Sequence, residues 1–236
     1  MVAAAAAAGA AHVLHPTLWI AAKEGRVEEV RRLLDEEVDI EERGGRYQTS
    51  PLHEAVLNNR EEVVRVLLTH GADASTEDSW GKTALHHFHG FVEILLLLLQ
   101  NGAEVSKRDN SDRTPLHGAA FNGLEEVVLI LLDHGADVSS TTDFGITPLH
   151  CAAHNGHATV VPLLLDKGAD FQWKTDGGRT AEDIAIVQSH PYIAEMIRVE
   201  AERREAVHRA RCEAFTWGIT SGWGWGRGFN VFVMWR

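Results

Sequence analysis

The sequence predicts an all-α solenoid, a row of about six helix-turn-helix units stacked on one another. The main observation is a string that occurs twice, as Thr114-Pro115-Leu116-His117 and as Thr147-Pro148-Leu149-His150. Each copy is followed by small residues, an apolar run and a Gly-Ala-Asp turn, and the copies are 33 residues apart. A fixed period of this length is typical of stacked repeats, in which each repeat is one supersecondary unit.

Composition argues against several kinds of partner. Of the 236 residues, 44% are hydrophobic, and the formal net charge is −12. Nucleic acid and anionic membranes attract basic proteins, so we expect no nucleic-acid partner and no membrane partner. Cys151 and Cys212, the two cysteines, form no Cys-x-x-Cys pair, which predicts reduced thiols and a cytoplasmic or nuclear location. The longest apolar run, Ile94 to Leu99, is too short to cross a bilayer.

The chain begins with an Ala-rich stretch, residues 1–14, that we expect to be a disordered tail. It lacks the basic start and strongly apolar centre of a signal peptide. A degenerate first unit is expected at about residues 15–48, where Ala21 and Ala22 hold the place of a small pair. Trp19 is expected to cover the open end of the core, and a role in binding is the alternative.

Five further units follow the same period, and each opens with a Ser or Thr that can cap a helix. These opening residues are Ser50, Thr83, Thr114, Thr147 and Thr180, at spacings of 33, 31, 33 and 33 residues. A unit of this kind does not bury its own apolar face, so its stability comes from its neighbours. The units are expected at about 49–81, 82–112, 113–145, 146–178 and 179–197.

A Thr-Pro-Leu-His string that opens a helical hairpin of 33 residues resembles the ankyrin repeat. The resemblance covers about residues 15–197, because the motif recurs in phase over that length. It implies helix pairs joined by short β-hairpin fingers. It also implies that the fourth motif residue hydrogen-bonds within and between repeats as a structural element. That residue is His53, His86, His117 or His150.

The third unit is two residues shorter than the others. When Gly90 is aligned with Gly123, the gap falls in the first helix, where His86-His87-Phe88 replaces the paired alanines. Bulky side chains there should push the helices apart or unwind half a turn, so we expect a local defect at residues 86–90. Three explanations stay open: a recognition notch, a weak point in the stack, or an error in the deduced sequence.

The last part of the chain changes character twice. Residues 198–214 are charged and contain i,i+4 pairs such as Glu200/Arg204, which predicts a solvated helical extension. Residues 215–236 are rich in Trp and Gly and contain no acid, and glycine at that density opposes a helix. Three interpretations of this tail stay open. It is a cap over the last repeat, an anchor for a partner or membrane, or a disordered end that is not native.

No set of residues in the sequence predicts catalysis. His150, His154 and His157 fall at helical spacing, but no acidic or Cys ligand is in phase with them to complete a metal site. The Gly-Lys-Thr triplet at residues 81–83 imitates the end of a phosphate loop without its first glycine. We therefore expect a protein that is not an enzyme and holds no metal and no cofactor.

A surface for protein contacts remains. In the ankyrin family the fingers and first helices line a concave face that binds partners. Equivalent finger positions here hold Tyr47, Trp80 and Phe144, and such rings are strong interface residues. The alternative is that each ring lies over the neighbouring finger and stiffens it. The remaining predicted contact residues are Lys82, Arg113, Ile146 and Arg179 in the fingers, and Phe121, His154 and Asn155 in the first helices.

The predicted function is therefore non-catalytic binding of a protein partner by a monomeric array. The acidic surface is expected to steer basic partners toward it. Two alternatives stay open. One is an adaptor whose repeats select a substrate while its C-terminal segment docks on other machinery, for example a ubiquitin ligase. The other is a scaffold that the Trp-rich tail anchors to a membrane.

Overall fold

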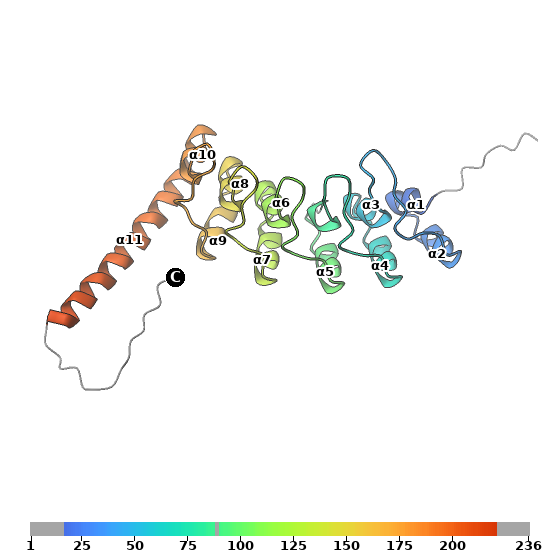
Figure 1. Ribbon diagram of the computed structural model, residues 1–236, viewed down its shortest axis with the longest axis horizontal. Helices are drawn as coiled ribbons and strands as arrows, with labels where there is room; N and C mark the ends of the chain where they lie inside the picture. The colour runs from blue at the N-terminus through green and yellow to red at the C-terminus, as the bar shows by residue number, and fades with distance from the viewer. Residues whose placement is uncertain (1–16, 88–89, 221–236) are drawn as a thin grey trace, which may run out of the picture.

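Consecutive helix pairs form a single row in the computed structural model, which describes residues 17–87 and 90–220, with side chains up to Arg211 (Figure 1). The first members of the pairs are α1 (Leu18–Glu24), α3 (Pro51–Leu57), η1 (Ala84–His87), α6 (Pro115–Asn122), α8 (Pro148–His154) and α10 (Ala181–Val187). The second members are α2 (Val27–Asp35), α4 (Glu61–Thr69), α5 (Val92–Gln100), α7 (Glu125–Asp133), α9 (Val160–Asp166) and α11 (Pro191–Thr220). The predicted all-α array of about six pairs is confirmed.

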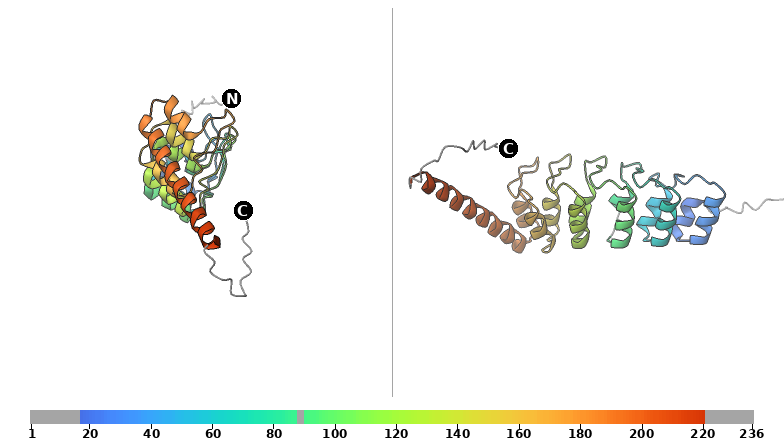
Figure 2. Two further views of the ribbon diagram at one scale, coloured as in Figure 1. Left: turned by 90° about the vertical axis from the view of Figure 1, so that its left-hand side faces the viewer. Right: turned by 90° about the horizontal axis from the view of Figure 1, so that it is seen from below.

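The first helices form one layer and the second helices form another, and the core lies between them (Figures 1 and 2). Leu116 and Leu149 of the first layer are fully buried, as are Leu67 and Leu164 of the second. The buried side chains form one continuous cluster along the row, so we expect no pair to be stable alone. The loops between the pairs all extend to the same side of the row (Figure 2).

The helix ends follow the predicted chemistry. The Ser50 hydroxyl accepts a hydrogen bond from the backbone amide of His53, and Pro51 occupies the first helical position of α3. In the Gly-Ala-Asp turn that follows α7, Gly135 has φ +88°, a left-handed conformation that glycine adopts without a steric cost. Motif residues therefore fix where the helices begin and end.

The five loops that join the repeats, here called fingers, end at residues 49, 82, 113, 146 and 179, just before the opening residues. The predicted β-hairpin character is only partly present, because no strand forms in residues 17–87 and 90–220 beyond an isolated bridge between Gly44 and Thr49. In the second finger, the turn is closed by a hydrogen bond of 2.8 Å from the Asp78 amide to the Lys82 carbonyl. Such turns are too short to form a ladder of strands.

Trp19 supports the first finger. Its indole Nε1 donates a hydrogen bond of 3.0 Å to the Thr49 hydroxyl, and its ring packs against Gly44 so closely that a Cβ at Gly44 would clash with it. The ring therefore contacts the first finger, and Nζ of Lys23 in α1 lies 4.9 Å from it, whereas the sequence suggested a cover for the open end of the core.

The third pair contains the expected defect. Where the other first helices have seven or eight residues in α-conformation, the third has the four-residue 3₁₀ turn η1. The missing residues leave too little chain for a second helical turn before α5. Residues 88 and 89, which the prediction includes, lie outside the described residues.

The last helix is longer than its predecessors. α11 has 30 residues and continues through Phe215–Thr220, which the sequence analysis placed in the tail. Arg204 fastens it to the array, because its guanidinium donates hydrogen bonds to the carbonyls of Leu165 in α9 and Ala169 in the turn that follows. Beyond that point α11 extends away from the row (Figure 1). The predictions for residues 1–16 and 221–236 lie outside the described part.

Candidate binding groove

Backbone hydrogen bonds join the fingers into one wall beside the first helices. The amide of Ser79 donates to the carbonyl of Tyr47 at 2.9 Å, and the amide of Asn110 donates to the carbonyl of Trp80 at 2.9 Å. The fourth and fifth fingers repeat this bond from Asp176 to Phe144 at 3.1 Å. The predicted aromatic positions therefore hold the fingers together through their backbone as well as presenting rings.

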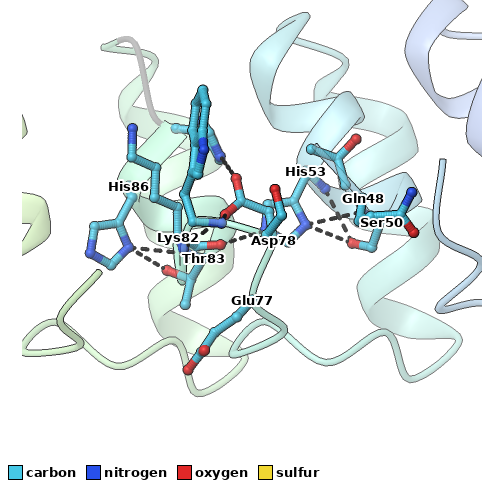
Figure 3. A network of polar contacts seen from close by, with 12 residues as sticks. Gln48, Ser50, His53, Glu77, Asp78, Lys82, Thr83 and His86 are labelled. Carbon is cyan, nitrogen blue, oxygen red and sulfur yellow. Dashed lines mark hydrogen bonds and ion pairs between the residues drawn. The ribbon is translucent and has the colours of Figure 1, made fainter. Parts of the chain in front are cut away.

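The motif histidines connect each first helix to the following finger. Nδ1 of His53 accepts the amide hydrogen of Ser50 at 3.2 Å, so Nε2 must carry the ring proton that it donates to the carbonyl of Lys82 at 2.9 Å. Figure 3 shows this link beside the next one, in which His86 accepts the amide of Thr83. Burial lowers the pKa of His53, which keeps the imidazole neutral in this tautomer.

Buried aspartate carboxylates accept backbone amides of the finger turns and so hold these turns in shape, a role that the sequence analysis missed. The carboxylate Oδ1 of Asp78 accepts the amides of Trp80 at 2.8 Å and Lys82 at 3.0 Å (Figure 3). Its Oδ2 accepts from Nε2 of His87 at 2.7 Å. Asp109 holds the third finger in the same way. The sequence signal that could have found both carboxylates is an acidic residue five positions before an opening Thr.

A groove of about 490 Å³ runs along the face where the fingers meet the first helices. It extends from Lys82 in the second finger to Ile184 in α10. Gly118 of α6 lies along it, Phe121 contributes a ring that is 50% exposed, and Cys151 of α8 lines it beyond Gly118. Burial raises the pKa of the Cys151 thiol to about 11, so this side chain is a neutral apolar surface at physiological pH.

Half of the predicted contact residues line this groove. They are Lys82, Arg113, Phe121, Ile146 and His154. The other five, Tyr47, Trp80, Phe144, Asn155 and Arg179, lie outside it. Among these, Asn155 donates its side-chain amide to the carbonyl of Phe121 at 2.7 Å and thereby joins α8 to α6.

The finger aromatics fall into two groups. The rings of Tyr47 and Trp80 contact each other with their centroids 4.2 Å apart, and Nζ of Lys82 lies 5.2 Å from the Trp80 ring. This is the contact that a stiffening role would require, although Trp80 remains 45% exposed. Phe144 is 62% exposed, while the nearby Trp173 donates its indole N–H to the carbonyl of Gly145. Trp173 does not occupy any of the repeated finger positions that the sequence analysis singled out.

The histidines that might have suggested a metal site have other partners. His150 contacts the carbonyl of Arg179 at 3.2 Å, and His157 contacts that of Phe121 at 2.8 Å. His154 stacks on the Phe121 ring with centroids 6.3 Å apart. Within residues 17–87 and 90–220, no group of three His, Cys, Asp or Glu side chains is arranged to hold a metal ion.

Comparison with known proteins gives one match to a family. A model described as ankyrin repeats (3 copies) matches residues 14–78, 71–142 and 136–204. No curated protein matches the chain. No helix in the described part of the chain is long and apolar enough to cross a membrane.

Proposed function

The chain belongs to the ankyrin repeat family, and on that premise we propose that it is a non-catalytic module that binds a protein partner through its concave face. This face is formed by the first helices and the fingers. The family consists of repeats that generally mediate protein–protein interaction. The observation that carries the proposal for this chain is the groove of about 490 Å³ on that face. We place the monomeric array and its partner in the cytoplasm or nucleus.

The groove supports binding because it combines exposed rings with a rigid frame. Phe121 in the groove and Trp80 and Phe144 on the fingers are all between 45% and 62% exposed. Aromatic side chains contribute much of the binding energy in protein interfaces when a partner buries them. The finger-to-finger and histidine-to-finger hydrogen bonds hold these residues in place before binding, so little ordering entropy is lost on association.

Site-specific photo-crosslinking tests the proposal. A photoreactive residue is introduced at Phe121 or Phe144 on the proposed face, and at Glu126 or Arg65 on the second helices as matched exposed controls. The same partner should be crosslinked in cells from both positions of the concave face and from neither control. Equal crosslinking from the second helices, or none from Phe121 and Phe144, would contradict the proposal.

The adaptor alternative is favoured by one observation, the extension of α11 beyond Arg204. Val207, on that part of the helix, is 53% exposed. A truncated chain that lacks residues 205–236, which are the extended part of α11 and the tail, separates the alternatives. If crosslinking from Phe121 and Phe144 persists, the array is sufficient to capture the partner. Anchoring or docking by the tail would then be a separate function. If capture is lost while the helical circular dichroism signal of the array is kept, the removed segment takes part in binding.

A further inference from the structure

Two departures from the repeat pattern open the groove. The fifth motif position is glycine in the fourth repeat, Gly118, whereas the repeats that open at Ser50, Thr83, Thr147 and Thr180 have Glu54, His87, Cys151 and Ile184 there. A Cβ at Gly118 would meet no atom within 4 Å, so there is open space above this point of α6. On the N-terminal side, the third repeat contributes only the four residues of η1 instead of a full first helix. The hollow over Gly118 is therefore a product of this sequence and not of the repeat architecture.

Apolar side chains surround the hollow. Phe121 and Ile146 line the groove together with the protonated thiol of Cys151, and Ile184 of α10 lines its far end. Phe121 is 50% exposed, so a ligand that covers it would remove substantial apolar surface from water. A bulky aliphatic or aromatic side chain matches this environment.

The charges in the groove are opposite in sign to the net charge of the chain. Lys82 and Arg113 line it, and neither has a carboxylate within 4.0 Å among the described residues. The one acidic residue in the lining, Asp109, is 8% exposed and accepts the amides of Ser111 and Arg113. The basic side chains thus have no acidic partner of their own to neutralise them.

Many of the acidic residues lie on the second-helix layer, away from the groove lining. Pairs of glutamates begin the second helices α2, α4 and α7, at Glu28 and Glu29, Glu61 and Glu62, and Glu125 and Glu126. Steering of basic partners, expected from the net charge of −12, therefore fits the second-helix layer better than the lining of the groove.

We propose, as a refinement that rests on the proposed function, that the groove binds an acidic peptide segment of the partner. A bulky apolar side chain of that segment enters the hollow over Gly118, and Asp or Glu side chains beside it pair with Lys82 and Arg113. The apolar side chain supplies most of the affinity, and the charge pairs supply selectivity and orientation.

Selection from a displayed library of short random peptides on the full chain tests this inference. Enriched peptides should carry a Leu, Ile, Met or Phe flanked by Asp or Glu. The dissociation constant of a synthetic copy, measured by fluorescence anisotropy, should rise about tenfold in Gly118→Leu, which fills the hollow. Lys82→Glu and Arg113→Glu should each weaken binding by about fivefold, and added salt should weaken wild-type binding.

Matched variants control for folding and for general charge effects. Gly118→Leu adds a residue of higher helix propensity where there is open space, so it should fold. Glu126→Leu adds the same side chain on the second-helix layer, and Arg209→Glu reverses a charge on α11. Both should leave the dissociation constant unchanged.

The outcomes separate this inference from the proposed function. Enriched peptides that are basic or uncharged, or whose binding is unaffected by Gly118→Leu and by both charge reversals, would overturn the inference. A library that gives no groove-dependent binder would overturn it as well. In each of these cases the crosslinks from Phe121 and Phe144 still decide the proposed function by themselves.

Discussion

His53, His117 and His150 each use both ring nitrogens in the same way, and this repetition assigns them to the architecture. In each case Nδ1 accepts the amide of the opening residue and Nε2 donates to the carbonyl that ends the next finger, 29 residues further on. All three side chains are at most 2% exposed. A buried imidazole with both nitrogens engaged cannot also ligate a metal or transfer a proton, so these three histidines have a structural role.

These imidazoles should make the array sensitive to acid. Burial, with help from the guanidinium groups of Arg108 and Arg113, lowers the pKa of His117 to about 4. An unfolded chain has a histidine pKa of about 6.5, so between these values the unfolded state binds more protons than the folded state. Stability should therefore be constant above about pH 6.5 and fall as the pH falls toward about 4, by about 1–2 kcal/mol at pH 5 for this residue.

Urea unfolding at neutral pH and at about pH 5, where carboxylates are still largely ionised, measures this loss. His117→Gln should lower stability at neutral pH and reduce the difference between the two conditions. His154→Gln removes an exposed imidazole and is the matched control. A difference between the two conditions that His117→Gln leaves intact would assign the acid sensitivity to other groups.

A second residue-scale feature is the left-handed backbone two residues before each opening residue. Three of the five positions are glycine, but Gln48 has φ +52° and Asp112 has φ +57°. A left-handed residue with a Cβ carries a steric cost of roughly 1–2 kcal/mol, and Gln is not among the residues that offset it by local hydrogen bonding.

Gln48→Gly should therefore stabilise the array. The expected net gain is about 0.5–1 kcal/mol, because part of the relieved steric cost is offset by the greater conformational entropy of glycine in the unfolded chain. The free energy of unfolding in urea measures the change. Gln48→Ala removes the same side-chain hydrogen bond to Gly45 but keeps the Cβ, so it should give no gain. Equal stability of the two variants would show that φ at this position costs nothing.

At the scale of elements, motif positions predict helices well because a cap and a turn glycine are local signals. α3, α6 and α8 all begin at the proline after a predicted opening residue. The defect in the third repeat could also be located, because two missing residues must be taken from some element. Its form as η1 and the support of its finger by His87 and Asp78 depend on contacts between elements, which a period does not encode.

The groove illustrates the same limit. Phe121, Ile146 and Lys82 could be predicted as its lining because the family places such positions on one face. The hollow over Gly118 could not be predicted, because it results from side chains that are absent at two neighbouring places.

The position of α11 is a further feature that the sequence did not predict. Its attachment through Arg204 to carbonyls of α9 and of the turn after it is a contact across repeats, and the charged sequence alone suggested only a solvated extension.

At the scale of the whole molecule, the array behaves as a row of units in which each contacts only its neighbours. Stability is then distributed along the row, and its weakest interface decides where the row separates. That interface is the one between the third and fourth repeats. η1 has four residues to pack on α6, and a small void of about 10 Å³ remains between Leu85, Leu95 and Leu131.

We therefore expect the array to open in two blocks, α1–α5 and α6–α11, with different free energies. The block with the degenerate first repeat should open more easily, by about 1–2 kcal/mol, because α11 and Arg204 close the other end. Hydrogen exchange followed by mass spectrometry on the full chain gives the opening free energy of peptides from each block.

Insertion of two alanines after His87 restores the 33-residue period and should reduce the difference between the blocks, because a complete first helix would then pack on α6. The same insertion after Gly118 makes an ordinary first helix two residues too long, so it should lower the opening free energy of the second block. If the two blocks of the unmodified chain exchange with one common free energy, or if the insertion after His87 leaves their difference as it was, the third repeat is not the weak point of the row.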